Sequence, residues 1–167
     1  MDFYQSLGGL VLGSRLRRAS EYFIAEVNKV YQHHGIDFEA GWFPLFYLLS
    51  SHDELTITSI ADRLSVSHSA SSQLVSQLRR KGLLHISRSE DDGRKQLVSL
   101  TAQGADLLAR IRPLWASIRE AMQDFLEENP AIAPLLPAIT ALEQECARLP
   151  LSQRIITQAR LIPNHHE

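Results

Sequence analysis

The side chains best suited to binding chemistry gather on one predicted helix, residues 67–81. Helical spacing places small hydroxyls, amides and a few basic groups on its outer face, namely His68, Ser69, Ser71, Ser72, Gln73, Ser76, Gln77 and Arg80. An ordinary solvent-facing helix would carry more Glu and Lys, yet no acidic residue occurs between Asp62 and Glu90. Groups that form hydrogen bonds without adding negative charge suit contact with the base edges and phosphates of DNA. The alternative is a plain serine-rich helix in solvent.

The signals that bound this helix also predict a second helix just before it. Ser67 can cap the amino end of helix 67–81, and Gly82 can end it in a left-handed conformation. Its predicted inner face holds Ala70, Leu74, Val75 and Leu78. Helix 57–64 precedes it, with Thr56 as a cap, and a short corner separates the two helices. This spacing is typical of a helix-turn-helix, which presents its second helix to a DNA groove.

A charged hairpin follows the two helices. Alternating apolar and polar residues predict strands over residues 84–88 and 96–100, and Asp92-Gly93 favours a tight turn between them. Arg94 at the turn suits a narrow minor groove, where Asp92 can hold its guanidinium in place. The predicted wing, residues 88–97, contributes Arg88, Asp92, Arg94 and Lys95. The alternative is a hairpin whose charges are simply solvated.

Further helical segments must position this helix and hairpin. Apolar residues at steps of three and four predict a long helix over residues 3–33, which Gly35 ends. The same period predicts a helix from Thr101 to Glu128, and Pro113 should kink it. Shorter helices are predicted over residues 39–51, 134–149 and 151–161. The fold class expected is mainly α with a small β-wing.

A sequence pattern across the hairpin resembles one family of bacterial transcriptional regulators. The pattern is Arg88-x-x-x-Asp92-x-Arg94-x-x-x-Val98-x-Leu100-Thr101-x-x-Gly104, preceded by Leu78-Arg79-Arg80-Lys81-Gly82-Leu83, and it is similar to that of the MarR family. The resemblance covers nearly the whole chain, residues 1–167, as a single MarR-like unit. It implies a winged helix-turn-helix lobe over residues 36–101. It also implies a helical dimerisation region formed by residues 1–35 and 102–161.

The same resemblance implies a function. Members of the family bind a palindromic operator in double-stranded DNA as homodimers, usually as repressors, and are often released by a small aromatic or phenolic effector. Helix 67–81 would lie in the major groove and the wing in the minor groove. The implied DNA contacts are Ser67, His68, Ser69, Ser72, Gln73, Gln77, Arg80, Arg88, Asp92, Arg94 and Lys95. Ala70 and Ser71 depart from the residues usual at their positions, so the bases contacted stay open.

An effector pocket is implied where the first, second and fifth helices of such a fold meet the DNA-binding lobe. The candidate residues are Arg15, Trp42, Phe46, Tyr47 and Trp115. The alternative is that these aromatic side chains are ordinary core residues.

The first helix and the tail also resemble the MarR-like parts of regulators fused to a GNAT-type acetyltransferase. No acetyl-CoA-binding loop of the Arg/Gln-x-x-Gly-x-Gly type occurs in the sequence, and we expect no enzyme activity. Two alternatives to a DNA-binding regulator stay open. One is a winged-helix module that binds protein and not DNA, and the other is the regulatory part of an acetyltransferase system.

The charge distribution favours a local basic surface. The whole chain has a formal net charge of −2, which at first argues against nucleic acid. Residues 55–100 nevertheless hold seven basic and four acidic side chains, whereas residues 121–150 hold one basic and five acidic. Phosphate contacts depend on the local surface rather than on the total.

Composition bounds the remaining classes. Hydrophobic residues make up 44% and charged residues 22%, as expected for a folded chain, and no apolar run reaches the ~18 residues that span a bilayer. The first positive charges follow an apolar stretch, the wrong order for a signal peptide, so we expect a cytoplasmic location. The one cysteine, Cys146, excludes an internal disulfide. The adjacent histidine pairs cannot chelate from one helical face, so we expect no metal and no cofactor.

Overall fold

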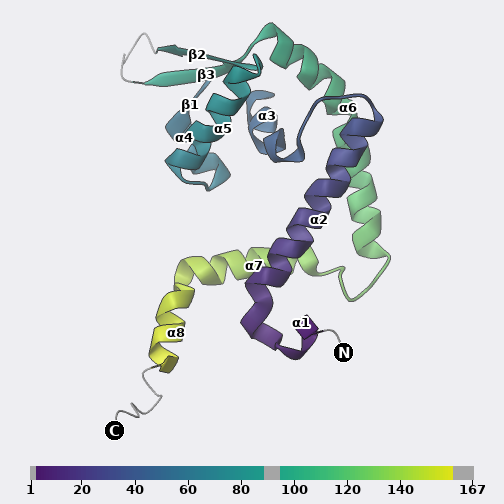
Figure 1. The fold of residues 1–167 in the computed structure, drawn as a ribbon, viewed down its shortest axis with the longest axis vertical. Coiled ribbons are helices and arrows are strands. Elements are labelled where there is room, and N and C mark those ends of the chain that lie inside the picture. Colours follow the sequence, from purple (N-terminus) through teal and green to yellow (C-terminus); the bar gives the residue numbers. More distant parts are fainter. Residues whose placement is uncertain (1–2, 89–94, 160–167) are drawn as a thin grey trace. The chain divides into compact units, whose positions relative to one another are not determined.

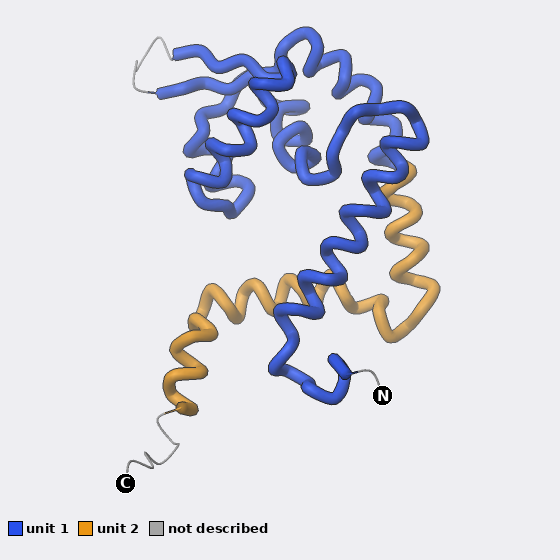
Figure 2. Tube along the Cα trace, viewed as in Figure 1, with its two compact units in different colours: residues 1–116 blue, residues 117–167 orange. Residues whose placement is uncertain are grey.

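A computed structural model describes residues 3–88 and 95–159 (Figure 1). The chain divides into two compact units, residues 1–116 and 117–167 (Figure 2). The first unit holds the helices up to residue 80, the sheet and the start of the helix that begins at Ala102. The second unit holds the rest of that helix and the last two helices. The structure thus has the predicted class, mainly α with a small β-wing.

The amino-terminal helical segment is broken where a continuous helix was predicted. The short helix α1 covers Phe3–Ser6, the 3-10 helix η1 covers Gly8–Val11, and α2 covers Leu12–His33. The prediction of one helix over residues 3–33 was therefore wrong in its first part. Gly8 has a φ of +54°, which interrupts the helical hydrogen-bond ladder. The predicted stop at Gly35 is confirmed.

A buried aromatic cluster forms the centre of the first unit. The 3-10 helix η2 (Ala40–Trp42) leads into α3 (Phe43–Leu49), and Pro44 falls in the first turn, where its missing N–H costs nothing. The Phe38 ring contacts Tyr31, Trp42 and Phe46 edge to face at centroid distances of 4.8, 5.5 and 5.1 Å. Trp42 and Phe46 are fully buried, so the segment predicted as a helix over residues 39–51 supplies the centre of this core.

A small antiparallel sheet lies beside the helix-turn-helix. Strands β2 (Leu84–Arg88) and β3 (Gln96–Leu100) have the predicted bounds and pair with Leu84 opposite Leu100 and Arg88 opposite Gln96. A third strand, β1 (Leu55–Thr56), was not predicted, and it pairs with the other edge of β3 through Leu55 and Val98. The predicted turn at residues 89–94 lies outside the described residues.

The helix-turn-helix consists of α4 (Ile57–Leu64) and α5 (His68–Arg80) (Figure 1). Ser65 links them in a left-handed conformation with a φ of +54°. The buried side chains of the pair include Ile57, Ile60, Ala61, Val75 and Leu78. Both helices therefore have their predicted bounds to within one residue.

The last three helices are α6 (Ala102–Glu127), α7 (Leu135–Arg148) and α8 (Leu151–Ala159). Pro113 lies inside α6, and that helix continues through it. Among the described residues, none of the helices combines the length and the hydropathy needed to cross a membrane.

Candidate nucleic-acid interface

The exposed face of α5 carries most of the predicted contact residues. Ser67 caps the helix, since its Oγ accepts a hydrogen bond from the Ala70 N–H at 3.1 Å. The predicted residues on this surface are Ser67, His68, Ser69, Gln73 and Arg80, which are exposed, and Ser72 and Gln77, which are half-buried. Spacings of three and four residues relate Ser69, Gln73, Gln77 and Arg80, so these side chains form a polar strip along the helix.

Two neighbouring residues of α5 exchange the faces predicted for them. Ser71 was expected outside but is 1% exposed, and its Oγ donates a hydrogen bond to the Ile57 carbonyl at 3.3 Å. Ala70 was expected inside but is exposed. A buried hydroxyl that finds an acceptor avoids the cost of desolvation, so Ser71 can fasten α5 to the first turn of α4.

The carboxyl end of α5 is fixed to the start of α6. Gly82 has a φ of +76°, and the N–H groups of Gly82 and Leu83 bond back to the Arg79 and Leu78 carbonyls at 2.9 and 3.0 Å. This is a Schellman cap, and it confirms the predicted role of Gly82. The Thr101 hydroxyl then donates to the Gly82 carbonyl at 2.6 Å and accepts from the Gly104 N–H at 3.0 Å.

Gly104 permits the close approach of these two segments. A Cβ atom at this position would lie 2.2 Å from the Leu83 carbonyl oxygen, far inside van der Waals contact. The Thr101-x-x-Gly104 part of the sequence pattern therefore has a structural reason, namely the packing of the first turn of α6 against the end of α5.

Lys81, the last residue before Gly82, attaches α5 to the aromatic cluster. Its ammonium lies 4.9 Å from the centre of the Trp42 ring and 3.5 Å from the Asp37 carboxylate. A hollow of about 260 Å³ opens beside it, lined also by Gln103, Asp106 and Arg110. Sequence reasoning did not single out Lys81, because a cation over a ring depends on tertiary structure.

Two basic residues of the wing lie at the ends of its described strands. Arg88 ends β2 and Lys95 precedes β3, and both are exposed. The other two predicted wing residues, Asp92 and Arg94, lie outside the described residues. The structure therefore gives positions for two of the four residues predicted for the wing.

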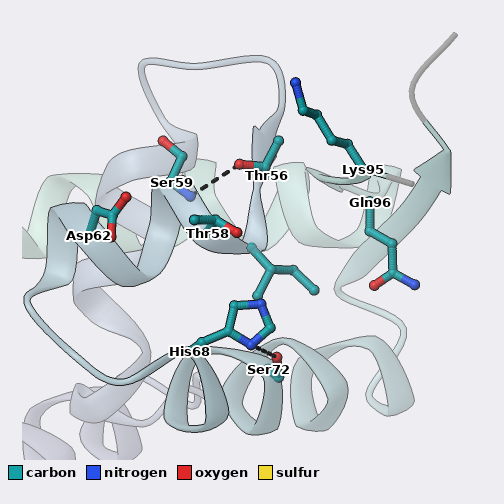
Figure 3. A pocket seen from close by; sticks show the side chains of 9 residues that line it. Thr56, Thr58, Ser59, Asp62, His68, Ser72, Lys95 and Gln96 are labelled. Atoms are coloured by element: carbon teal, nitrogen blue, oxygen red, sulfur yellow. Dashed lines mark hydrogen bonds between the residues drawn. The ribbon is translucent and has the colours of Figure 1, made fainter. Parts of the chain in front are cut away.

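A polar hollow of about 600 Å³ lies between α4, α5 and the start of β3 (Figure 3). His68 and Ser72 of α5 form one wall, and their side chains approach to 3.5 Å between Nδ1 and Oγ. The opposite walls hold Thr56, Thr58, Ser59 and Asp62 on the side of α4, and Lys95 and Gln96 on the side of β3. The hollow therefore joins the polar strip of α5 to the base of the wing.

The residues predicted for an effector pocket fall into separate groups. Trp42 and Phe46 belong to the buried cluster around Phe38, whereas Tyr47 lies against Trp115 with ring centres 5.8 Å apart. Phe43, which was not predicted, also packs on Trp115 at 5.0 Å. Arg15 is exposed on α2, and no contact between it and these rings is present among the described residues.

One polar atom in this region is buried without a hydrogen bond. The Trp115 Nε1–H has no partner of normal geometry among the described residues. Burial raises the pKa of Tyr31 above its usual value, and the nearby Trp115 indole opposes that shift. Within residues 3–88 and 95–159, no group of three or more His, Cys, Asp or Glu side chains could hold a metal ion.

Comparison with known proteins identifies this architecture. The sequence model of the MarR family matches residues 34–95. Over these residues the winged helix of this chain is similar to the MarR family. No curated protein sequence matches the chain at the threshold applied.

Solved structures of MarR-family proteins share the fold over most of the chain. A mutant MarR from E. coli complexed with operator DNA has 18% identity and a TM-score of 0.64, over 84% of this chain and 97% of that one. PcaV from Streptomyces coelicolor, in complex with its natural ligand, has 23% identity and a TM-score of 0.62, over 83% and 92%. A MarR family transcriptional regulator from Silicibacter pomeroyi has 27% identity and a TM-score of 0.55, over 83% and 89%.

Proposed function

We propose that this protein is a homodimeric transcriptional regulator that occupies a palindromic operator. In this proposal α5 lies in the major groove and the wing enters the minor groove, so that bound protein represses transcription. The observation that carries the proposal is the exposed strip of α5, whose hydroxyl, amide and basic side chains come without an acid from residue 63 to residue 89. The E. coli MarR complex with operator DNA supports the same use of this fold. No catalytic step is part of the proposal.

The proposed dimer is supported by apolar side chains that the single chain leaves exposed. In the first unit these are Leu10, Leu12, Leu16, Tyr22 and Ile24, and in the second they are Leu136, Leu142, Leu151, Ile155 and Ile156. Exposed apolar surface on this scale is typical of an interface between subunits. We assign residues 1–35 and 102–161 to dimerisation and residues 36–101 to DNA binding.

The proposal includes release from the operator by a small effector. PcaV was solved with its natural ligand, and a buried, unbonded Trp115 Nε1–H lies beside the exposed ring of Tyr47 in this chain. The exposed ring of Tyr47 offers an aromatic or phenolic molecule a surface on which to stack.

The experiment is a fluorescence anisotropy titration of the full chain with the DNA that precedes its own gene. We expect saturable binding that weakens steeply with salt, because Lys and Arg contacts to phosphate release counterions. Gln73→Ala should alter the base preference more than the salt slope, and Arg94→Ala should weaken binding without unfolding the protein.

The control is Arg119→Ala, which removes an exposed arginine of α6 outside the DNA-binding segment. It should leave binding unchanged as long as light scattering shows the same oligomeric state as the wild type. Absence of binding at low salt would contradict the proposal and favour a protein-interaction module. Undiminished affinity in Arg94→Ala would remove the wing from the mechanism.

A further inference from the structure

The amino end of α5 exposes an apolar side chain where its position in the helix favours an acid. Ala70 is the third residue of α5, and its N–H donates to the Ser67 Oγ at 3.1 Å. A serine cap is often completed by Glu or Gln at this third position, and the positive end of the helix dipole also favours a carboxylate there. Ala70 supplies neither group, and it is exposed. Capping therefore does not explain the methyl group at this position.

The residues next to Ala70 let the helix end approach another surface closely. Ser67 and Ser69 are both small and both exposed. The ring of His68, the largest side chain of this turn, extends from α5 toward α4 and lines the hollow between them (Figure 3). Short side chains therefore surround Ala70 on its exposed side. This matters because a residue as short as alanine can contact a base only when the helix backbone lies close to it.

Ala70 begins a row of side chains along α5. Gln73 and Gln77 follow it at steps of three and four residues, so the three side chains lie on the same side of the helix. Gln73 is exposed and Gln77 is half-buried, whereas Ser71 and Val75 are buried and mark the inner face. In a helix-turn-helix, the amino-terminal residues of the second helix contact base edges in the major groove. Ala70 and Gln73 hold that place in this row.

A methyl group and an amide one helical turn apart have a common complement in DNA. Thymine carries the apolar group of the major groove, its methyl group, and alanine is among the side chains that contact it. A glutamine amide can form two hydrogen bonds with adenine in the same groove. Three residues of α-helix rise by about 4.5 Å, close to the separation of about 3.4 Å between base pairs. Two neighbouring A·T pairs therefore fit Ala70 and Gln73 together.

We propose that Ala70 packs against the methyl group of one thymine in each half-site of the operator and so selects thymine at that position. The proposal rests on the proposed function, since it needs α5 to lie in the major groove. Gln73 bonds the adenine of the neighbouring pair, so each half-site has two adjacent A·T pairs at the amino end of α5. A cytosine in place of the thymine presents no methyl group to Ala70. A carboxylate at residue 70 would repel the phosphates beside the groove, and the chain has no acid from residue 63 to residue 89.

The test uses the full chain and the operator found by footprinting the DNA that precedes its own gene. Each thymine of a half-site is replaced in turn by deoxyuridine, which lacks only the methyl group, and the symmetric position is replaced with it. Anisotropy titrations should find a position where the affinity falls about fourfold per half-site, the effect expected for one buried methyl-sized group. At that position a 5-methylcytosine·guanine pair should bind about fourfold per half-site more tightly than an unmethylated cytosine·guanine pair, because it restores the methyl group.

Two variants assign the methyl contact to Ala70. Ala70→Gly removes the side chain, and Ala70→Ser places a hydroxyl there with a better helix former than glycine. Each variant should reduce the effect of deoxyuridine at that position to less than about twofold per half-site. Each comparison measures one variant on two DNAs, so a change in the stability of the variant cancels. The matched control is Ala105→Ser, at an exposed alanine near the start of α6, which should keep the full effect.

The outcomes distinguish this inference from the proposed function. Operator binding in which no thymine responds to deoxyuridine by about twofold or more overturns the inference and leaves the regulator in place. An equal effect of deoxyuridine in the wild type and in both variants also overturns it, because another residue would then contact the methyl group. The same holds if 5-methylcytosine binds no better than cytosine. Absence of saturable binding at low salt overturns both proposals.

Discussion

The winged helix buries its apolar side chains within one chain, whereas α7 and α8 bury none of their described residues. The completely buried side chains of the winged helix include Leu45, Phe46, Ile60, Leu78 and Val98. The two regions have similar apolar patterns in sequence but differ in where the apolar faces find contacts. The winged helix finds them between α3, α4, α5 and the sheet. The terminal helices leave Leu136, Leu142 and Ile155 exposed in the single chain, so under the proposed dimer we expect their stability to depend on a second subunit.

The largest expected effect separates these two regions directly. Leu78→Ala empties a fully buried position of α5 and should lower the free energy of unfolding by about 3 kcal/mol. Leu142→Ala, on α7 with 39% exposure, should cost less, and its cost should depend on protein concentration. Urea denaturation at two protein concentrations measures both. Equal, concentration-independent losses would remove the distinction between the regions.

A smaller effect tests the join between α5 and α6. Gly104→Ala puts a Cβ atom against the Leu83 carbonyl and should lower the free energy of unfolding by about 2 kcal/mol, because the backbone must shift. Gly41→Ala is the matched control, since nothing lies within 4 Å of a Cβ atom there. Thermal unfolding compares the two variants, and a neutral Gly104→Ala would show that the close approach is not maintained in solution.

Hydrogen bonds of two threonines provide another comparison between the winged helix and the terminal helices. Thr101→Val removes a hydroxyl that bonds both Gly82 and Gly104, and it should cost about 1 kcal/mol. Thr140 of α7 only donates back to the Leu136 carbonyl of its own helix at 3.1 Å, so Thr140→Val should cost less than about 0.5 kcal/mol. Chemical denaturation of both variants measures the difference, and a reversed order would contradict it.

The smallest effect concerns an ion-pair group in the second unit. Glu145 lies 2.7 Å from Arg148 and 2.9 Å from Arg154, and the Arg148 hydrogen bond is the main cause that lowers the pKa of Glu145 below 4.5. A lowered carboxyl pKa contributes stability above the unfolded-state value and loses it as the pH falls through the folded-state value. These groups are exposed, so the contribution is small.

Glu145→Gln should therefore lower the thermal midpoint slightly at neutral pH, and the difference from wild type should vanish in acid below the lowered pKa. Glu143→Gln, which removes the same charge from the same helix, is the control. A midpoint difference that grows toward acid pH would have the wrong sign for this explanation.

The sequence predicted the elements whose local signals and burial agree. Helix 57–64, the two wing strands and the left-handed end of α5 at Gly82 were all confirmed, because apolar period, cap and turn residue point to the same boundaries.

The parts that could not be predicted depend on contacts distant in sequence. Ser71 is buried because the Ile57 carbonyl can accept its hydroxyl, which residue type alone does not reveal. Strand β1 has two residues, too few to show an alternating pattern. Asp62 marked the edge of the acid-free stretch in sequence, but folding places it on the hollow beside His68.

The Thr101 junction has a mechanical consequence. Its hydroxyl bridges the last turn of one helix to the first turn of the next, and the glycine three residues on leaves no gap between them. The two helices cannot change direction independently at this point unless the hydrogen bonds of the Thr101 hydroxyl break. A force that tilts the beginning of α6 should therefore tilt α5 with it, so a signal could change the angle of the helix proposed to contact DNA without deforming that helix.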